Sequence, residues 1–208
     1  ESKALVATRH SLRTGSVVRT RKRDWLMTKR DKGPRIRKVP VGDNRRRLVC
    51  PDCEYVAYEN PKVVVGVVAT WEDKLLMCKR AIEPRLGYWT LPAGFMEMGE
   101  SPQEGAAREA WEEAYAKLEI IDLLAVYSLR HISQLQLFYR ARLLSPEVSA
   151  GPESEEVGLF SFDRLPATDL AFPSVHWAID HFQQARGAEV FSPFGNPTGR
   201  SGDMGRGR

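Results

Sequence analysis

GFMEMGESPQEGAAREAWEEAYA, residues 94–116, decides the fold of this chain, because it contains a helix start, an apolar helix face and a spaced set of charged side chains. Ser101 offers an N-cap oxygen, Pro102 suits the first helical position, and Glu104 lies where the carboxylate of a capping box is found. The stretch therefore predicts a helix that begins at Pro102.

The predicted helix has two different faces. Three glutamates at positions i, i+3 and i+4 share one face, and like charges at this spacing repel unless a cation sits among them. Hard divalent cations such as Mg²⁺ and Mn²⁺ prefer carboxylate oxygens and also accept phosphate oxygens from a substrate. The glutamates are Glu109, Glu112 and Glu113, and the residues predicted to pack on a sheet are Ala107, Ala110, Trp111 and Ala114. The cluster predicts a magnesium site, with an exposed acidic helix face as the alternative.

The residues of this stretch occur at fixed spacings. The set consists of Gly94, Glu100, Arg108, Glu109, Glu112 and Glu113, with five residues between the first two and seven between the second and third. This pattern resembles the signature of the Nudix hydrolases, Gly-x5-Glu-x7-Arg-Glu-U-x-Glu-Glu-x-Gly-U, where U is apolar. One position departs, because Tyr115 stands where the family has glycine. A tyrosine forced to a positive φ there would cost on the order of 1–2 kcal/mol.

The resemblance implies a fold and a metal. The order of the predicted elements fits an α/β/α sandwich with a mixed β-sheet, and it resembles the Nudix fold over residues 35–185. In that family the carboxylates of the motif helix bind Mg²⁺ or Mn²⁺ and assist the attack of water on a diphosphate. Carried over to this chain, the metal ligands are Glu109, Glu112, Glu113 and the carbonyl of Gly94.

The resemblance also gives supporting roles to other motif residues. Arg108 is expected to orient a glutamate through charge-assisted hydrogen bonds. Glu100 is expected to support the same arrangement or to join the metal shell. Glu112 is an additional ligand or the general base.

A second source of catalytic carboxylates is the acidic, glycine-containing loop at residues 146–158. Loops of this kind bring side chains over sites that other elements form. The candidates are Glu153, Glu155 and Glu156. We nominate Glu156 as the general base in preference to Glu112.

Two strands and a loop precede the motif. Residues 62–71 and 74–79 are apolar and rich in β-branched side chains, and the acidic pair between them predicts a hairpin. In the loop that follows, Arg80 and Arg85 could reach substrate phosphates, and Tyr88 could stack on a base. The alternative is that both arginines are solvated and that the tryptophan after Tyr88 fills the core.

The elements after the motif complete the predicted fold. Residues 118–127, 134–144 and 157–162 predict three strands, the second with clear alternation of apolar and polar side chains. Residues 172–184 carry an apolar stripe typical of a helix packed on a sheet. His131, in the turn between the first two of these strands, is a candidate base or substrate contact, although a lone histidine in a turn is more often neither.

The chain divides into four parts by composition. Residues 1–34 are basic and are expected to be disordered, with a nucleic-acid-binding arm or an organelle-targeting peptide as alternatives. Residues 35–61 resemble a degenerate zinc ribbon, residues 62–186 form the predicted Nudix domain, and residues 187–208 are a Gly- and Arg-rich tail that is expected to be disordered. Residues 1–49 hold 16 Lys and Arg against 4 Asp and Glu, so the net charge of +4 comes from the front end of the chain.

Cys50-Pro-Asp-Cys53 has the two-residue spacing of half a tetrahedral zinc site. No second cysteine pair occurs, and the upstream histidine, His10, is distant. Some Nudix hydrolases carry a small zinc ribbon in this place, and VCPDC followed by YVAYENPK resembles its second knuckle, with Glu54 in place of the usual glycine. A vestigial loop is therefore expected rather than an intact Zn²⁺ site, and a partly occupied or intermolecular site is the alternative.

Cysteine content and hydropathy bear on the compartment. Three cysteines do not make a secreted disulfide framework, so a reducing compartment is expected. No apolar run approaches the roughly 18 residues of a membrane span. We expect a cytoplasmic protein without a membrane partner, or a plastid or other organellar protein if residues 1–34 are a targeting segment.

The substrate class also follows from the resemblance. Three stretches together resemble bacterial Nudix proteins and plastid relatives that hydrolyse FAD. They are the ribbon-like segment, GYWTLPAGFMEMGE and GPESEEVGLF. FAD, NADH or ADP-ribose is therefore the expected substrate, and nucleoside triphosphates and RNA caps are alternatives. A nucleotide- or nucleic-acid-binding module without turnover is the alternative of another class. Nucleic acid is not the expected partner, and a homodimer is left open.

Overall fold

The structure is a computed structural model that describes residues 32–198, and it divides into two compact units between Glu59 and Asn60. The predictions for residues 1–31 and 199–208 lie outside the described residues. In the described part, no helix is long and apolar enough to cross a membrane.

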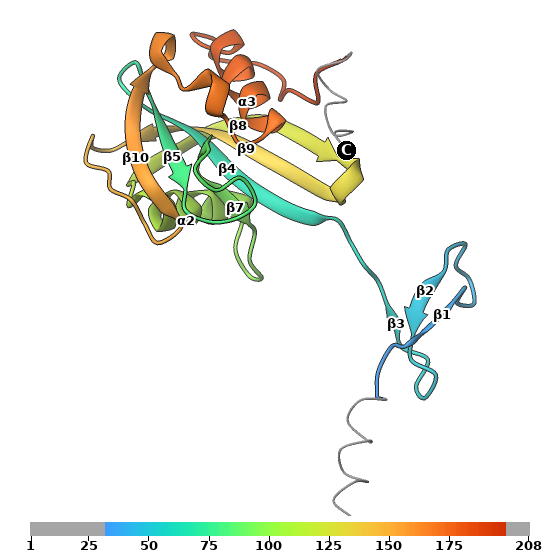
Figure 1. Ribbon diagram of the computed structural model, residues 1–208. Helices are drawn as coiled ribbons and strands as arrows, with labels where there is room; N and C mark the ends of the chain where they lie inside the picture. Colours follow the sequence, from blue (N-terminus) through green and yellow to red (C-terminus); the bar gives the residue numbers. More distant parts are fainter. Residues whose placement is uncertain (1–31, 199–208) are drawn as a thin grey trace, which may run out of the picture. The chain divides into compact units, whose positions relative to one another are not determined.

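The small unit is a three-stranded antiparallel sheet (Figure 1). Its strands are β1 (Ile36–Lys38), β2 (Arg47–Val49) and β3 (Val56–Ala57). Asp43 shapes the turn between β1 and β2, because its carboxylate accepts hydrogen bonds from the backbone of Asn44 and Arg45 and from the Arg47 side chain. Among its described residues only two hydrophobic side chains, Val49 and Cys50, are buried. This unit therefore has almost no core of its own.

The large unit is built on a seven-stranded sheet with the order β10-β5-β4-β9-β8, to which β6 and β7 add at β5 and β4. The strands are β4 (Lys62–Trp71), β5 (Lys74–Arg80), β6 (Trp89–Thr90), β7 (Ala93–Phe95), β8 (Leu118–Leu129), β9 (Gln134–Leu143) and β10 (Ser154–Ser161). The pairing of β4 with β9 is parallel and the other pairings are antiparallel. The predicted mixed sheet and the β4–β5 hairpin are thus confirmed.

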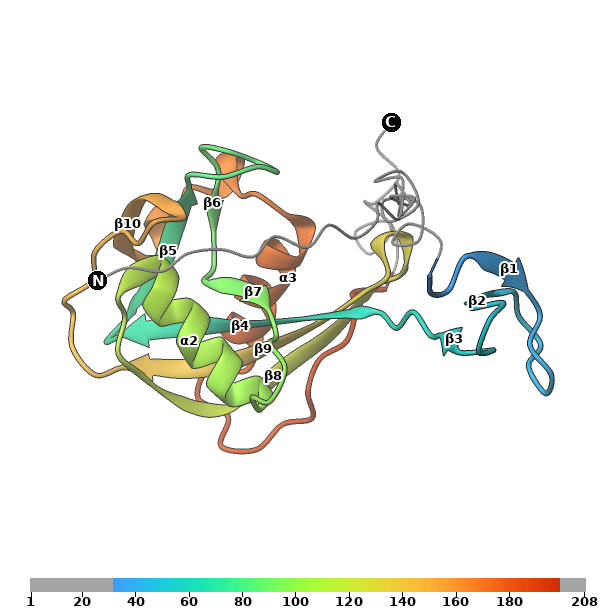
Figure 2. The ribbon, with the colours of Figure 1, turned by 90° about the horizontal axis from the view of Figure 1, so that it is seen from below.

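Two helices cover opposite faces of this sheet. Figure 1 shows α3 (Pro173–Gln184) above the strands and α2 (Pro102–Ala114) below them, and the view from below in Figure 2 has α2 in front of the strands. Each helix closes a separate hydrophobic cluster, one around Ala106 and Ala110 and the other around Val175 and Ala178. Short 3₁₀ turns follow β8 (Arg130–Ile132) and β10 (Phe162–Arg164 and Ala167–Asp169). The fold is the predicted α/β/α sandwich.

The start of α2 follows its local sequence. The Ser101 hydroxyl accepts a hydrogen bond from the Glu104 backbone at 3.3 Å, and the Glu104 carboxylate accepts one from the Ser101 backbone at 2.7 Å. This reciprocal pair is the predicted capping box, with Pro102 in the first turn. The helix ends at Tyr115, which adopts the left-handed conformation with φ 47° and ψ 29°.

Two expectations about packing were wrong. Trp111 does not pack on the sheet, because it is 45% exposed, whereas Ala106, Ala110 and Ala114 are buried. Residues 187–198, which were expected to belong to a disordered tail, run along β8. There the Phe194 backbone N–H donates to the Leu124 carbonyl and its carbonyl accepts from the Val126 N–H, both at 2.9 Å.

Candidate active site

The glycine that opens the motif lies against the motif helix. Gly94 is the central residue of β7 and pairs with Val65 of β4. A side chain at this position would collide with the carboxylate of Glu109. A larger residue here would displace the Glu109 carboxylate, and the same close packing places the Gly94 backbone beside the acidic face of α2.

Arg108 is the cation that sits among the motif glutamates. Its guanidinium donates to Glu100 at 2.9 and 3.1 Å, and to Glu109 and Glu112 at 2.8 Å each. A further bond reaches the carbonyl of Phe95 at 3.0 Å. The glutamates raise the pKa of the Arg108 guanidinium, with its hydrogen bonds to Glu100 as the largest cause, so its charge is permanent. In this structure Arg108 contacts the carboxylates, as the resemblance implies.

Glu100 ties the loop before α2 to this cluster. Besides Arg108, its carboxylate accepts a hydrogen bond from the Glu97 backbone at 2.6 Å. The bonds from Arg108 and then from Glu97 hold the pKa of Glu100 below its usual range. Glu100 does not line the cavity described below. It acts on the other carboxylates through Arg108.

Glu109 and Glu113 are the buried members of the acidic face, 9% and 6% exposed. Burial, followed by repulsion from Glu109, raises the pKa of the Glu113 carboxyl to about 8. Burial also raises the pKa of Glu109, although hydrogen bonds from Arg108 oppose the shift. The second oxygen of Glu113, Oε2, is buried without a hydrogen-bond partner among the described residues. A buried, unpartnered carboxylate oxygen is costly unless a cation or a proton joins it.

The donor set fits a hard divalent cation in chemistry, since the two buried carboxylates line one cavity with Gly94 and with a third carboxylate, Glu112. The side chains are not gathered around one point, because no group of three or more acidic, histidine or cysteine side chains in residues 32–198 converges as a ready metal site. Arg108 holds Glu112 and one oxygen of Glu109. The unpartnered oxygen of Glu113 is the atom left for a cation.

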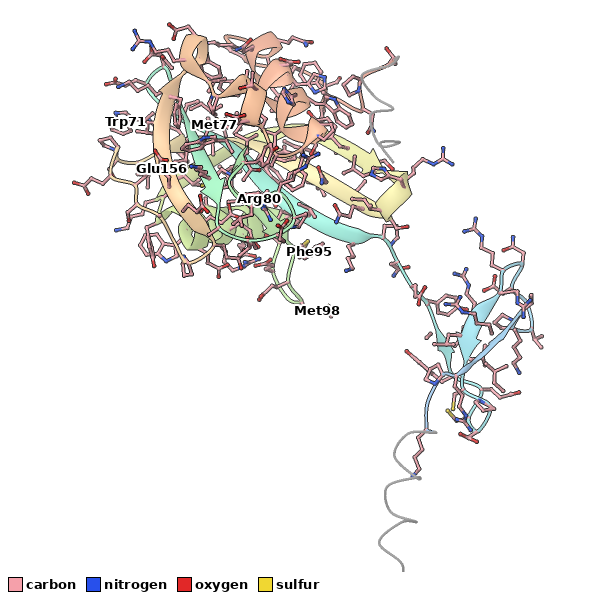
Figure 3. The ribbon with its side chains drawn as sticks, in the orientation of Figure 1. Trp71, Met77, Arg80, Phe95, Met98 and Glu156 are labelled. Carbon is pink, nitrogen blue, oxygen red and sulfur yellow. The ribbon has the colours of Figure 1, made fainter. Side chains whose placement is uncertain are left out.

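A cavity of about 1460 Å³ opens over these carboxylates. Of the residues predicted for the site, it is lined by Arg80, Gly94, Arg108, Glu109, Glu112 and Glu113, and also by His131. Arg80 and Phe95, labelled in Figure 3, both line it. The helix acids, the end of β5 and the turn after β8 are thus brought to one space, although they are far apart in the sequence.

Arg80 reaches the cavity from the end of β5. Its Nε donates to the Pro84 carbonyl at 2.8 Å, and its guanidinium lies over the Phe172 ring at 5.3 Å. Its charge lowers the pKa of Glu113, against the larger effect of burial, and both side chains line the same cavity. Arg85 and Tyr88 do not line the cavity; the Arg85 guanidinium instead lies over the Tyr88 ring at 5.3 Å.

The acidic loop contributes a different glutamate from the one nominated. Its backbone packs on the end of α2, where the Gly151 N–H donates to the Glu113 carbonyl at 2.9 Å. Glu153 then lines the cavity, and its charge raises the pKa of both Glu109 and Glu113. Glu156 does not line the cavity; it is exposed on β10, where Figure 3 labels it.

Two large side chains of the cavity wall were not among the predicted site residues. Trp111 was assigned to the core and Tyr115 was noted only as a departure from the motif, yet both line the cavity. Their ring centroids lie 5.4 Å apart. The available signal was the pair of aromatic residues four apart at the end of the motif helix.

The cysteine pair of the small unit does not complete a zinc site. Asp52, between the two cysteines, accepts hydrogen bonds from Arg35 at 2.8 and 3.2 Å. Backbone N–H groups of Asp52 and then Cys53 lower the pKa of the Cys50 thiol. The two cysteines and Asp52 line a small pocket. The other residues that line it are Lys32, Gly33, Pro34 and Tyr55, none of which is a usual zinc ligand. Within residues 32–198 the two thiols have no further ligands beside them, so this part of the chain does not fit a tetrahedral zinc ion.

Comparison with protein families gives two matches. The family described as NUDIX domain matches residues 60–180, which is more than half of the chain. A zinc-ribbon family described as Nudix N-terminal matches residues 32–59. The two matched segments meet at the boundary between the two compact units.

Individual relatives agree with the family matches. The crystal structure of a NUDIX hydrolase from Nitrosomonas europaea is 47% identical, with a TM-score of 0.73, and the match covers 77% of this chain and 92% of that one. An ADP-ribose pyrophosphatase of Methanocaldococcus jannaschii is 31% identical over 125 residues, 57% of this chain and 72% of the relative. An NAD-capped RNA hydrolase NudC of Pseudomonas aeruginosa is 28% identical over 132 residues, and the match spans 46% of that protein.

Proposed function

Because the chain belongs to the Nudix hydrolase family, we propose that it hydrolyses the diphosphate bond of a nucleoside diphosphate linked to another moiety, with a dinucleotide cofactor such as FAD, NADH or ADP-ribose as substrate. The observation that carries this proposal is the buried, unpartnered oxygen of Glu113 beside Glu109 in a large cavity. Arg108 neutralises Glu109 but does not reach this oxygen of Glu113, so the pair is stable as two anions only if a further cation binds.

Glu109 and Glu113, with Glu112 and the Gly94 carbonyl, would hold Mg²⁺ or Mn²⁺ in this proposal. A bound divalent cation supplies charge neutralisation at the diphosphate and lowers the pKa of a water molecule. Arg108 holds Glu109 and Glu112 in position through its hydrogen bonds at 2.8 Å. It is a positioning residue, since its donors already bind Glu100, Glu109, Glu112 and Phe95.

Two residues opposite α2 are assigned to the substrate and to the water. Arg80 faces the carboxylates, and a guanidinium suits the recognition of a phosphate oxygen. Glu153 replaces Glu156 as the group that takes a proton from the attacking water, because it lines the cavity close to Glu109 and Glu113.

The size of the cavity and the relatives support a dinucleotide. The cavity, at about 1460 Å³, exceeds the roughly 300–1,000 Å³ common for small-molecule sites. Similarity to an ADP-ribose pyrophosphatase and to an NAD-capped RNA hydrolase favours substrates in which a diphosphate links a nucleoside to another group.

An NAD-capped RNA end is the second candidate substrate. It is favoured by the similarity to the NudC protein and by the basic small unit, in which residues 32–59 hold 7 Lys and Arg against 4 Asp and Glu. A cationic surface of this kind attracts phosphate backbones.

The proposal is tested by incubating the full chain with Mg²⁺ and FAD, NADH, ADP-ribose, NAD-capped RNA or nucleoside triphosphates, and measuring mononucleotide release. We expect release from at least one dinucleotide cofactor and loss of release with EDTA. An absence of turnover with every substrate, together with tight, salt-sensitive binding of nucleic acid, would instead support a binding module.

A further inference from the structure

An exposed aromatic pair stands beside the carboxylates on α2. Trp111 and Tyr115 are 45% and 41% exposed, and their ring centroids lie 5.4 Å apart with the planes at 82°. The two rings therefore form a corner rather than a single flat surface. A planar ring placed in that corner would contact both side chains.

The position of the pair connects it to the proposed reaction centre. Both rings line the cavity that also contains Glu109, Glu112 and Glu113. Glu112 is the chain neighbour of Trp111, and Glu112, Trp111 and Tyr115 all line this cavity. A ligand with its diphosphate near Glu109 and Glu113 can therefore extend past Glu112 to the rings.

The backbone at Tyr115 has a conformation that favours glycine. Tyr115 has φ 47° and ψ 29°, in the left-handed region that strains a residue with a side chain. The contact between the two aromatic rings offsets part of this strain, although each residue is more than 40% exposed. Glycine would therefore hold the helix end at least as well.

The surroundings of the indole suit an anionic, aromatic ligand. The Lys117 Nζ lies over the Trp111 ring, 5.9 Å from its centroid, so a cation covers one face of the indole and leaves the other for a ligand. The charge of the neighbouring Glu112 is neutralised by Arg108, which donates to that carboxylate at 2.8 Å. A phosphate-linked ring would thus find a stacking surface and a positive charge together.

We infer that Trp111 and Tyr115 form a stacking platform for a planar heteroaromatic ring, a nucleobase, nicotinamide or flavin, at one end of the diphosphate substrate. The inference rests on the proposed function and deepens it, since it assigns part of the substrate specificity to the residue that replaces the motif glycine. Neither ring takes part in the bond cleavage.

The test compares kcat and KM for FAD, NADH and ADP-ribose in the wild type and in four variants, together with their melting temperatures. Trp111→Ala should raise KM about fivefold to tenfold, the lower end of the range for loss of one stacked ring, with kcat nearly unchanged. Trp111→Phe should recover most of the affinity. Tyr58→Ala is the matched control, because Tyr58 is an exposed aromatic residue that does not line the cavity, and it should leave KM unchanged.

Tyr115→Gly is the decisive variant, because the two roles predict different results. A purely structural tyrosine predicts a melting temperature that is equal or higher and an unchanged KM. The platform predicts a melting temperature that is equal or higher and a KM several-fold higher for at least one of the three substrates. An unchanged KM in both Tyr115→Gly and Trp111→Ala, with an active wild type, overturns the platform alone. A wild type that cleaves none of the substrates overturns the proposed function, and the platform falls with it.

Discussion

The two units of this chain handle charge in opposite ways. In the small unit, residues 32–59, basic residues outnumber acidic ones by 7 to 4, and the carboxylates of Asp43 and Asp52 are each paired with an arginine near the surface. In the large unit, residues 60–198, acidic residues outnumber basic ones by 19 to 12. Two of these acids, Glu109 and Glu113, are buried.

The difference shows which unit is stable enough to contain a buried charge. The large unit closes two hydrophobic clusters on the two faces of its sheet. It can therefore carry the cost of a carboxylate oxygen that is buried without a partner. The small unit buries two hydrophobic side chains and cannot carry such a cost. A site that needs buried charge is thus confined to the large unit.

The strongest test of this comparison is Glu113→Gln. The change removes the buried charge without changing the volume of the side chain. We expect turnover of the best dinucleotide substrate to fall by about 10²–10³-fold, because an electrostatic contact at the reaction centre is lost. The melting temperature should stay the same or rise, because the buried carboxylate is neutralised. Steady-state kinetics and thermal melts measure the two effects.

Glu119→Gln serves as the control for Glu113→Gln. Glu119 is exposed, and its Oε2 accepts a hydrogen bond from Nη2 of Arg142 at 2.5 Å. It does not line the cavity. Its replacement should leave turnover unchanged. Unchanged turnover in Glu113→Gln would show that the metal site has been assigned to the wrong carboxylate.

The next test distinguishes two glutamates of one loop. Glu153→Gln should lower kcat by about 10²-fold, the lower end of the range for loss of a general base. Glu156→Gln should change kcat less than about twofold, since this side chain lies outside the cavity. Equal effects of both changes would contradict the assignment of the base.

A smaller effect concerns the pH dependence of stability in the large unit. His181 is buried, and its Nδ1 lies 2.7 Å from the Tyr127 hydroxyl. Burial lowers the pKa of His181 below its model-peptide value, against an opposing effect of Asp180. The folded state therefore favours the neutral ring. The stabilisation is fully present above pH 6.5, the usual pKa, and is lost as the pH falls from there toward the folded-state pKa.

Chemical denaturation between pH 5 and 8 measures this loss. His181→Phe should flatten the slope of stability against pH in that range, whereas His176→Gln, on the same helix, should retain it. A slope that is the same in all three proteins would show that other groups produce the acid sensitivity.

The smallest expected effect is that of zinc on the small unit. Its described residues supply two thiols, and the family that matches them is a zinc ribbon. We expect elemental analysis of the purified full chain to give far less than one zinc per chain, and a chelator to leave the melting curve unchanged. One zinc per chain would show that ligands outside residues 32–198, or a second copy, complete the site. Mass measurement in solution distinguishes these two sources.

Much of the fold could be predicted because its signals are local. The capping box at Ser101 and the β-branched strands around a two-residue turn each act within a few residues, and all of them appear in the structure. The spacing from Gly94 to Glu113 likewise identified the helix that carries the site. Arg108 contacts its glutamates as the resemblance implied.

The errors concern side chains whose surroundings come from distant elements. Trp111 has a spacing compatible with the core face of α2, but the alanines take that face and leave the indole at the cavity. Glu153 and Glu156 look alike in the sequence. A register shift at the start of β10 and the contact of the Gly151 backbone with α2 decide which one faces the carboxylates.

The sequence by itself determined the family, the motif helix and the charges on its surface, because helix capping and helical spacing depend on neighbouring residues. The tertiary structure decided which of those charges are buried and which residues face them. Burial depends on the sheet, the loop after β9 and the end of β5, which approach α2 only when the chain has folded. The chemistry proposed for Glu113 exists only in that arrangement.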